Sequence, residues 1–446
     1  MSWVGRGAAI LSVRRNWRRP FLLTFCTAAR EGRRTVMQRD RGERACVNSE
    51  AAARGWRPGP AFGLILGHFA IFGVVAGVRG VVWAELVDAL RIGTGAFGSA
   101  QLAASFVSVA VVTVYARLAA RINPRSIAGG GLVLMTIAML WLAWAGSFAM
   151  VVVALAVFGA STGLLDGAMI QGSVDWERAA KRARMNVMHA GFSVGAVGGA
   201  IAAGLGLALG ANYPTLLIGA AVLVVVVLIA TALIAYPPSG PVSSGSGGSW
   251  RPVLAAPGIG ALIGIVVWSI VVESIVFVWA VIYLRDDLGA SAAAGGASFA
   301  LFNATMFAGR MLNSLLVLRL GERASLLVSG AGIALSGLLL VASHSVPLAM
   351  LALALAGLGV AGIFPTVMSA AAGRLPDYSR ELTTVVMTVT YIAFMITPPA
   401  IGWLAELSSL RTALLLLPAS GLIIVTLAAR GLSSTPDAPG RSTTDS

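Results

Sequence analysis

Two carboxylates isolated in apolar stretches are the residues of this sequence best suited to chemistry. Glu273 has no charged neighbour for eleven residues on either side, and Asp166 lies in the apolar run that begins near Phe148. A charged side chain at the centre of a bilayer costs about 2.5–3.5 kcal/mol on insertion scales, and those kept there mark solute and proton pathways. We therefore predict that both are protonatable cavity carboxylates. The alternatives are a structural ion pair for Glu273 and, for Asp166, an interfacial acid that pairs with a loop arginine.

Other polar and aromatic residues in the apolar stretches are candidates for the same cavity. Arg79 could bind an anionic group of a solute, because a guanidinium matches the geometry of carboxylate and phosphate. His189 could relay protons, with a hydrogen-bonded packing role as the alternative. The remaining candidates, for which helix packing is the alternative, are Asn303, Trp279 and Tyr391.

The enzyme motifs that match on paper lack the context they need. Residues Gly191–Gly195 fit the nucleophile pattern G-x-S-x-G but lie in a long apolar stretch rather than between a strand and a helix. The single lysine, Lys181, follows no glycine-rich loop, which excludes a Walker site and with it an ATP-driven pump. Cys26 and Cys46 make no metal-ligand spacing with the histidines. The sequence therefore predicts no enzyme, no cofactor and no metal site.

The composition indicates that membrane helices position these residues. Of the 446 residues, 57% are hydrophobic and 11% are charged, against about 25% charged in ordinary soluble domains. An α-helix needs roughly 20 apolar residues to cross a bilayer. Twelve such spans are predicted, at 61–84, 96–116, 127–145, 148–171, 187–210, 214–236, 258–284, 295–317, 324–343, 347–371, 384–405 and 409–429. The predicted fold class is an all-α membrane protein.

A segment rich in Pro, Gly and Ser divides the spans into two groups of six. This predicted linker at 237–257 separates an N-terminal half at 61–236 from a C-terminal half at 258–430. The fourth spans of the two halves end alike, in Gly163–Met169 and Gly362–Met368. Two pseudo-symmetric six-helix halves are the layout expected of a repeat-built transporter.

Positive charges predict the orientation of the chain. If the N-terminus is inside, the cytoplasmic loops carry twelve Lys and Arg residues and the outer loops carry three, so both termini are predicted to be cytoplasmic. The predicted tails are 1–60 and 431–446. The first is Arg-rich and predicted to be disordered, with binding of anionic lipid or a true start at Met37 as alternatives. The net charge of +14 reflects this tail and the loops and does not indicate nucleic-acid binding.

Several motifs resemble the MosC-like branch of the major facilitator superfamily, which comprises bacterial inner-membrane transporters. They are Gly163–Ala200, Glu273–Arg285, Gly309–Arg310, Gly357–Pro365 and Pro398–Pro399 with Gly402. The resemblance covers roughly residues 61–430. It implies that spans one and seven face each other across a cavity. Arg79 and Glu273 lie at similar depth in these spans, so they could form an ion pair.

The resemblance also implies gating contacts and a class of solute. Arg121 keeps the family's arginine in the loop after span two, although Ala120 replaces an acid there. Arg310 is the second candidate gate residue, with snorkelling to the membrane surface as its alternative. The same region resembles, more distantly, the proton-coupled fucose permeases. Those proteins carry an acid at the position of Asp166 and a polar residue at that of His189. This resemblance implies a sugar-like or polyol-like solute.

The combined prediction is a secondary active transporter in the inner membrane. It moves a small polar solute by alternating access between its halves and is coupled to protons. The expected partners are this solute, protons and membrane lipid, without nucleic acid, and the expected state is a monomer. The alternatives are a drug or metabolite exporter and a non-transporting membrane sensor.

Overall fold

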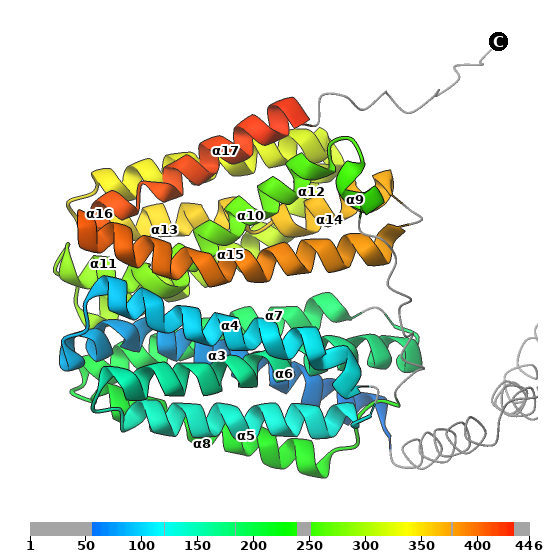
Figure 1. Ribbon diagram of the computed structural model, residues 1–446, viewed down its shortest axis with the longest axis horizontal. Helices are drawn as coiled ribbons and strands as arrows, with labels where there is room; N and C mark the ends of the chain where they lie inside the picture. Colours follow the sequence, from blue (N-terminus) through cyan, green and yellow to red (C-terminus); the bar gives the residue numbers. More distant parts are fainter. Residues whose placement is uncertain (1–55, 120, 183, 239–250, 376–377, 432–446) are drawn as a thin grey trace, which may run out of the picture.

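The computed structural model describes residues 56–119, 121–182, 184–238, 251–375 and 378–431. Most of the predicted tails, 1–55 and 432–446, therefore lies outside the described residues. The described residues fold into helices that form two groups lying side by side (Figure 1). The predicted all-α membrane fold is confirmed.

The first group contains six long helices. They are α3 (Pro58–Leu90), α4 (Thr94–Ala119), α5 (Pro124–Ala143), α6 (Phe148–Ala180), α7 (Met185–Ala208) and α8 (Tyr213–Leu233). Polar side chains cap the first turn of several of these helices. Asn123 accepts a hydrogen bond from the backbone N–H of Arg125 at the start of α5, and Asn212 accepts one from Thr215 at the start of α8. Such caps satisfy backbone donors that the first turn of a helix leaves free.

The second group is more interrupted. It contains α9 (Arg251–Ala255), α10 (Ile259–Ile275), a π-helical turn (Val276–Ala280), α11 (Val281–Asp286), α12 (Ala292–Ala342), α13 (Val346–Val360), α14 (Ile363–Arg374), α15 (Ser379–Leu407), α16 (Leu410–Ala413) and α17 (Leu416–Gly431). The short helix α9 falls inside the segment predicted as linker. Residues 239–250 of that linker lie outside the described part of the chain.

Eleven helical segments of the described residues are long and apolar enough to cross a membrane. The predicted span at 295–317 is absent from this set. It forms the first limb of α12, where Asn303, Thr305 and Arg310 lower the hydropathy. The two limbs of α12 meet at Gly321, whose φ of 81° and ψ of 169° break the helical path. A positive φ is available to glycine at no steric cost, so the chain can turn there between two crossings.

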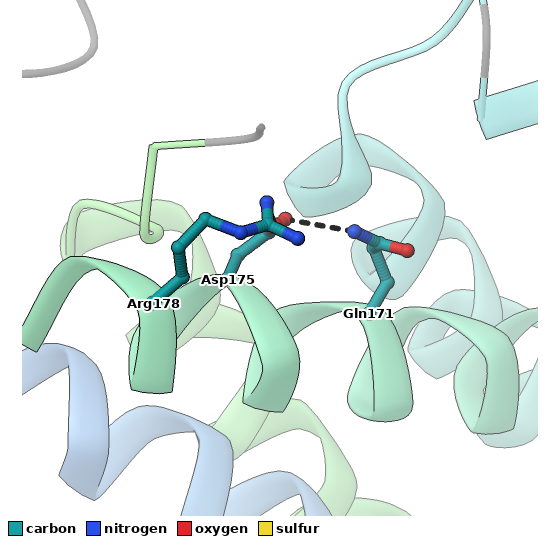
Figure 2. A network of polar contacts seen from close by, with 3 residues as sticks. All are labelled: Gln171, Asp175 and Arg178. Carbon is teal, nitrogen blue, oxygen red and sulfur yellow. Dashed lines mark hydrogen bonds and ion pairs between the residues drawn. The ribbon is translucent and has the colours of Figure 1, made fainter. Parts of the chain in front are cut away.

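α6 is longer than predicted, because the charged segment after residue 171 remains helical to Ala180. Asp175 is buried, and its carboxylate accepts hydrogen bonds from Gln171 (3.1 Å) and Arg178 (3.1 Å) on neighbouring turns (Figure 2). Side chains three and four residues apart meet only if the backbone is helical. The indole of Trp176 also donates to the carbonyl of Pro58 (2.8 Å), which fixes this end of α6 against α3.

The two groups contact each other closely at one end of the molecule, here called the Arg285 end. The opposite end, where α8 ends at Leu233 and α10 begins at Ile259, is called the linker end. At the Arg285 end α12 lies against α7, and a Cβ at Gly296 would stand 2.6 Å from the carbonyl oxygen of Ala200. The absence of a side chain at Gly296 therefore permits this backbone approach.

Candidate functional site

A cavity of about 350 Å³ lies between the two groups of helices. Both groups contribute to its lining, which includes Phe72, Arg79, Trp83, Gln101, Ser105, Ser108, Phe158, Thr162, Asp166, Phe192, Glu273, Ser274, Phe277, Met306, Arg310, Tyr391 and Phe394. The volume is at the small end of the range of ligand pockets. The mixture of aromatic rings, hydroxyls and charges suits a small polar molecule.

Asp166 lies in the middle of α6 and reaches this cavity. It follows the start of α6 at Phe148 by about 27 Å and precedes Ala180 by about 21 Å at 1.5 Å per residue. Its partner is not a loop arginine, and its depth in the membrane stays a prediction. The half-buried carboxylate accepts a hydrogen bond of 2.6 Å from the hydroxyl of Tyr391 on α15. This bond joins the two groups of helices.

Glu273 lies on α10 and lines the cavity from the second group. Its half-buried side chain makes no hydrogen bond or ion pair with another described residue. The π-helical turn that begins at Val276 follows directly, and such turns are frequent at functional sites. Phe277 of this turn also lines the cavity, where its ring packs edge to face on Phe299 at 5.2 Å.

Arg79 does not form an ion pair with Glu273, which was the structural alternative for that carboxylate. Its guanidinium carbon lies over two aromatic rings instead, 3.7 Å from the ring centre of Phe158 and 4.7 Å from that of Trp83. The positive charge is attracted by the electron-rich faces of these rings. They hold Arg79 on α3 within the first group, so the carboxylate of Glu273 is left free.

Arg310 joins the central cavity to a second pocket of about 480 Å³. This pocket is lined by His189, Phe307, Met311, Asn313, Pro365 and Ser369 among others. These residues lie toward the linker end of α7, α12 and α14. His189 therefore lines the second pocket rather than the central cavity, and its exposed ring packs against Phe69 at 4.6 Å.

Trp279 and Asn303 are not part of the lining of the central cavity, contrary to prediction. Trp279 is buried and packs edge to face on Phe97 at 5.8 Å. Asn303 is buried, and its amide donates to the carbonyl of Phe299 (2.9 Å) within α12. Both occupy the packing role that was their alternative. Arg121 is exposed between α4 and α5, outside the cavity.

Several lining residues were missed by the sequence reasoning. Gln101, Ser274 and Thr162 contribute polar atoms, and Phe158 contributes the ring over Arg79. A glutamine in the second predicted span was a usable signal, because polar side chains are rare in such spans. Ser274 and Thr162 gave no signal, since serine and threonine are common in packed membrane helices.

The Arg285 end of the cavity is closed by polar contacts between the two groups. Arg285 forms an ion pair with Glu85 near the end of α3. The backbone N–H of Gly95 donates to Glu406 (2.7 Å), and the indole of Trp403 donates to the hydroxyl of Ser99 (3.1 Å). The cavity is therefore covered at this end, whereas the second pocket extends it toward the linker end.

Comparison with known proteins finds similarity to one family of membrane proteins. A family model described as Major Facilitator Superfamily matches residues 259–445. An uncharacterized MFS-type transporter of Yersinia pestis is 29% identical over 263 residues, which are 58% of this chain and 67% of that protein. Membrane protein MosC of Rhizobium meliloti is 30% identical over 158 residues, 35% of this chain and 38% of MosC.

The C-terminal part of the chain is thus similar to the major facilitator superfamily. The MosC-like motifs agree with the similarity to MosC. The crystal structure of the nucleoside transporter NupG superposes with a TM-score of 0.67, covers 84% of this chain and 100% of NupG, and is 11% identical. That likeness shows the fold alone. The family match and the relative named a transporter, together with eleven described helices long and apolar enough to cross a membrane, indicate a multi-pass membrane transporter.

Proposed function

We propose that this protein is a proton-coupled secondary transporter that moves a small polar solute by alternating access between its two halves. The observation that carries the proposal is the position of Glu273. Its carboxylate lines a cavity between the halves and has no ion-pair partner among the described residues. Retaining such a group inside a membrane protein is costly, and a protonation cycle gives a reason to retain it.

The arrangement of contacts supports alternating access. The ion pair of Glu85 and Arg285 and the bond from Gly95 to Glu406 close the Arg285 end. The central cavity adjoins a second pocket toward the linker end through Arg310. A solute in the cavity would thus reach one side only. Transport requires a second state in which these end contacts separate and the halves close at the linker end.

The lining supports a small polar solute. Hydroxyls of Ser105, Ser108 and Thr162 face the same space as the rings of Phe72 and Phe192. Hydroxyl groups pair with polar substituents, and aromatic faces pack on the apolar faces of a ring. A sugar-like or polyol-like solute, suggested by the family resemblance, fits this lining. The proposed location is the inner membrane, with both termini cytoplasmic and the protein a monomer.

Purified protein in proteoliposomes with an imposed pH gradient tests the proposal. A panel of labelled sugars, polyols and amines should contain a compound whose uptake or release depends on the gradient and stops when a protonophore collapses it. Gradient-driven efflux of a hydrophobic drug from the proteoliposomes would favour an exporter instead. Binding of a panel compound without flux in either direction would favour a sensor and contradict transport.

A further inference from the structure

Three buried groups on the cavity lining have a polar atom without a protein partner. They are Nε of Arg79, the amide nitrogen of Gln101 and the hydroxyl of Ser274. The side chains of Gln101 and Ser274 are 4% and 0% exposed. A buried donor without a partner loses its hydrogen bond to water and gains none in return, which is unfavourable. Three such groups on one cavity point to a bound molecule that supplies the acceptors.

Arg79 and Gln101 lie next to each other on the cavity wall. Trp83 of α3 and Phe97 of α4 pack against each other at 5.3 Å, where the two helices run antiparallel. One turn further toward the linker end, α3 presents Arg79 and α4 presents Gln101. Both side chains line the cavity, so their donors face one region of it.

The guanidinium of Arg79 is a cavity charge without a carboxylate partner among the described residues. The carboxylate of Asp166 accepts a hydrogen bond from Tyr391, and Glu273 forms no ion pair with a described residue. No described carboxylate forms an ion pair with Arg79. The rings of Phe158 and Trp83 lie over its guanidinium carbon. Because the N–H donors of a guanidinium lie in its plane, stacked rings leave the edge of the group available to an anion.

We propose that Arg79, Gln101 and Ser274 bind the carboxylate of a monoanionic, hydroxylated solute such as a sugar acid. The planar donor edge of an arginine matches the two oxygens of a carboxylate. A single guanidinium beside these two neutral donors suits a monoanion better than a phosphate dianion, whose second charge would stay unpaired in a low-dielectric site. The hydroxyls of Ser105, Ser108 and Thr162 would contact the remainder of the solute. This inference rests on the proposed transport function and names its substrate class.

Binding to matched acid and neutral compounds tests the proposal. The pairs are D-gluconate with D-sorbitol, D-glucuronate with D-glucose, and glycerate with glycerol. Affinity is measured on the purified protein by quenching of tryptophan fluorescence and by thermal shift in detergent. At least one acid should bind the wild type tenfold or more tightly than its neutral counterpart. If no acid binds better than its counterpart, including the case where no acid binds, the proposal is overturned.

Two variants and a control assign the effect to this wall. Arg79→Gln should reduce the acid-to-neutral affinity ratio at least tenfold, and Gln101→Glu should do the same because the new carboxylate occupies the guanidinium. Arg91→Gln removes an exposed arginine outside the cavity and should leave the ratio unchanged. If the Arg79→Gln variant does not fold, the isosteric Gln101→Glu variant tests the proposal. An unchanged ratio in a folded variant of either residue overturns the proposal.

Flux measurements separate this inference from the transport proposal. If a pH gradient drives flux of neutral sugars or polyols and the matching acids are transported no better, the carboxylate site is wrong while the transport function stands. If an acid binds selectively through Arg79 but nothing crosses the membrane, the site stands and the transport function fails.

Discussion

The hydroxyl of Tyr391 on α15 donates a hydrogen bond of 2.6 Å to the carboxylate of Asp166 on α6. Three further polar contacts between the halves, Glu85 with Arg285, Gly95 with Glu406 and Ser99 with Trp403, lie at the Arg285 end. The bond between Tyr391 and Asp166 is therefore the polar contact that ties the halves together at the cavity itself. A proton arriving at Asp166 would weaken the bond, because a neutral acid is a poorer acceptor than a carboxylate.

A double-mutant cycle should detect this bond. Tyr391→Phe and Asp166→Ala are expected to be coupled by about 0.5–3 kcal/mol, the range for hydrogen bonds to neutral and charged groups. The effect of Tyr391→Phe on thermal stability in detergent should therefore disappear when Asp166 is already alanine. Tyr378→Phe, which alters an exposed tyrosine just before α15, serves as the control. Strictly additive effects of the two cavity substitutions would show that no such bond contributes.

Glu273→Gln should reduce gradient-driven accumulation of the solute more than tenfold. Exchange of solute across the membrane with the same pH on both sides should remain largely intact. The amide preserves the shape of the side chain but cannot release a proton. Proteoliposome uptake with and without a pH gradient measures both activities. Asp88→Asn, which removes an exposed carboxylate outside the cavity, should leave both unchanged. Normal accumulation by the Glu273→Gln variant would remove the residue from the coupling mechanism.

The ion pair of Glu85 and Arg285 should help to keep the Arg285 end closed. Its side chains are 30% and 20% exposed, and partly exposed pairs contribute about 0.2–1 kcal/mol. Glu85→Gln should raise the labelling rate of a cysteine at Ala104, on the cavity lining, by about two- to fivefold from that side of the membrane. Combining Glu85→Arg with Arg285→Glu should restore the slow rate. Equal rates in Glu85→Gln and wild type would exclude a gating contribution.

The close approach of α7 and α12 predicts opposite effects for two glycines of α12. A Cβ at Gly296 would lie 2.6 Å from a backbone oxygen, whereas Gly332 has no atom within 4 Å of that position. Alanine favours a helix by about 1 kcal/mol over glycine, but overpacking costs about 1–3 kcal/mol. Gly296→Ala should therefore lower the melting temperature, and Gly332→Ala should keep or raise it. Equal shifts would mean that the helices are not in contact there.

The charge distribution predicts the side of the membrane on which each end lies. Alkaline phosphatase is active only outside the cytoplasm, so a fusion after Gly289, in the loop between α11 and α12, should be active. A fusion after Gly240 in the predicted linker should be inactive. The reverse pattern would invert the proposed orientation.

The helices were largely predictable from the sequence, and the errors have local causes. Apolar spans reveal membrane helices because the backbone of each span must satisfy its own hydrogen bonds in lipid. The predicted loop after residue 171 proved helical, and there Asp175 pairs with Arg178 and accepts a hydrogen bond from Gln171 on adjacent turns. A prediction from hydropathy counts each charged residue separately and takes no account of ion pairs between them.

The sequence by itself determined the membrane class, the two groups of spans and the isolation of Glu273 and Asp166 within them. Only the tertiary structure decided which residues these acids and Arg79 meet. Tyr391 lies 225 positions from Asp166, and Phe158 rather than Glu273 faces Arg79. The physical reason is that hydropathy depends on residues along one helix, whereas these contacts depend on which helices pack together and on the rotation of each about its axis.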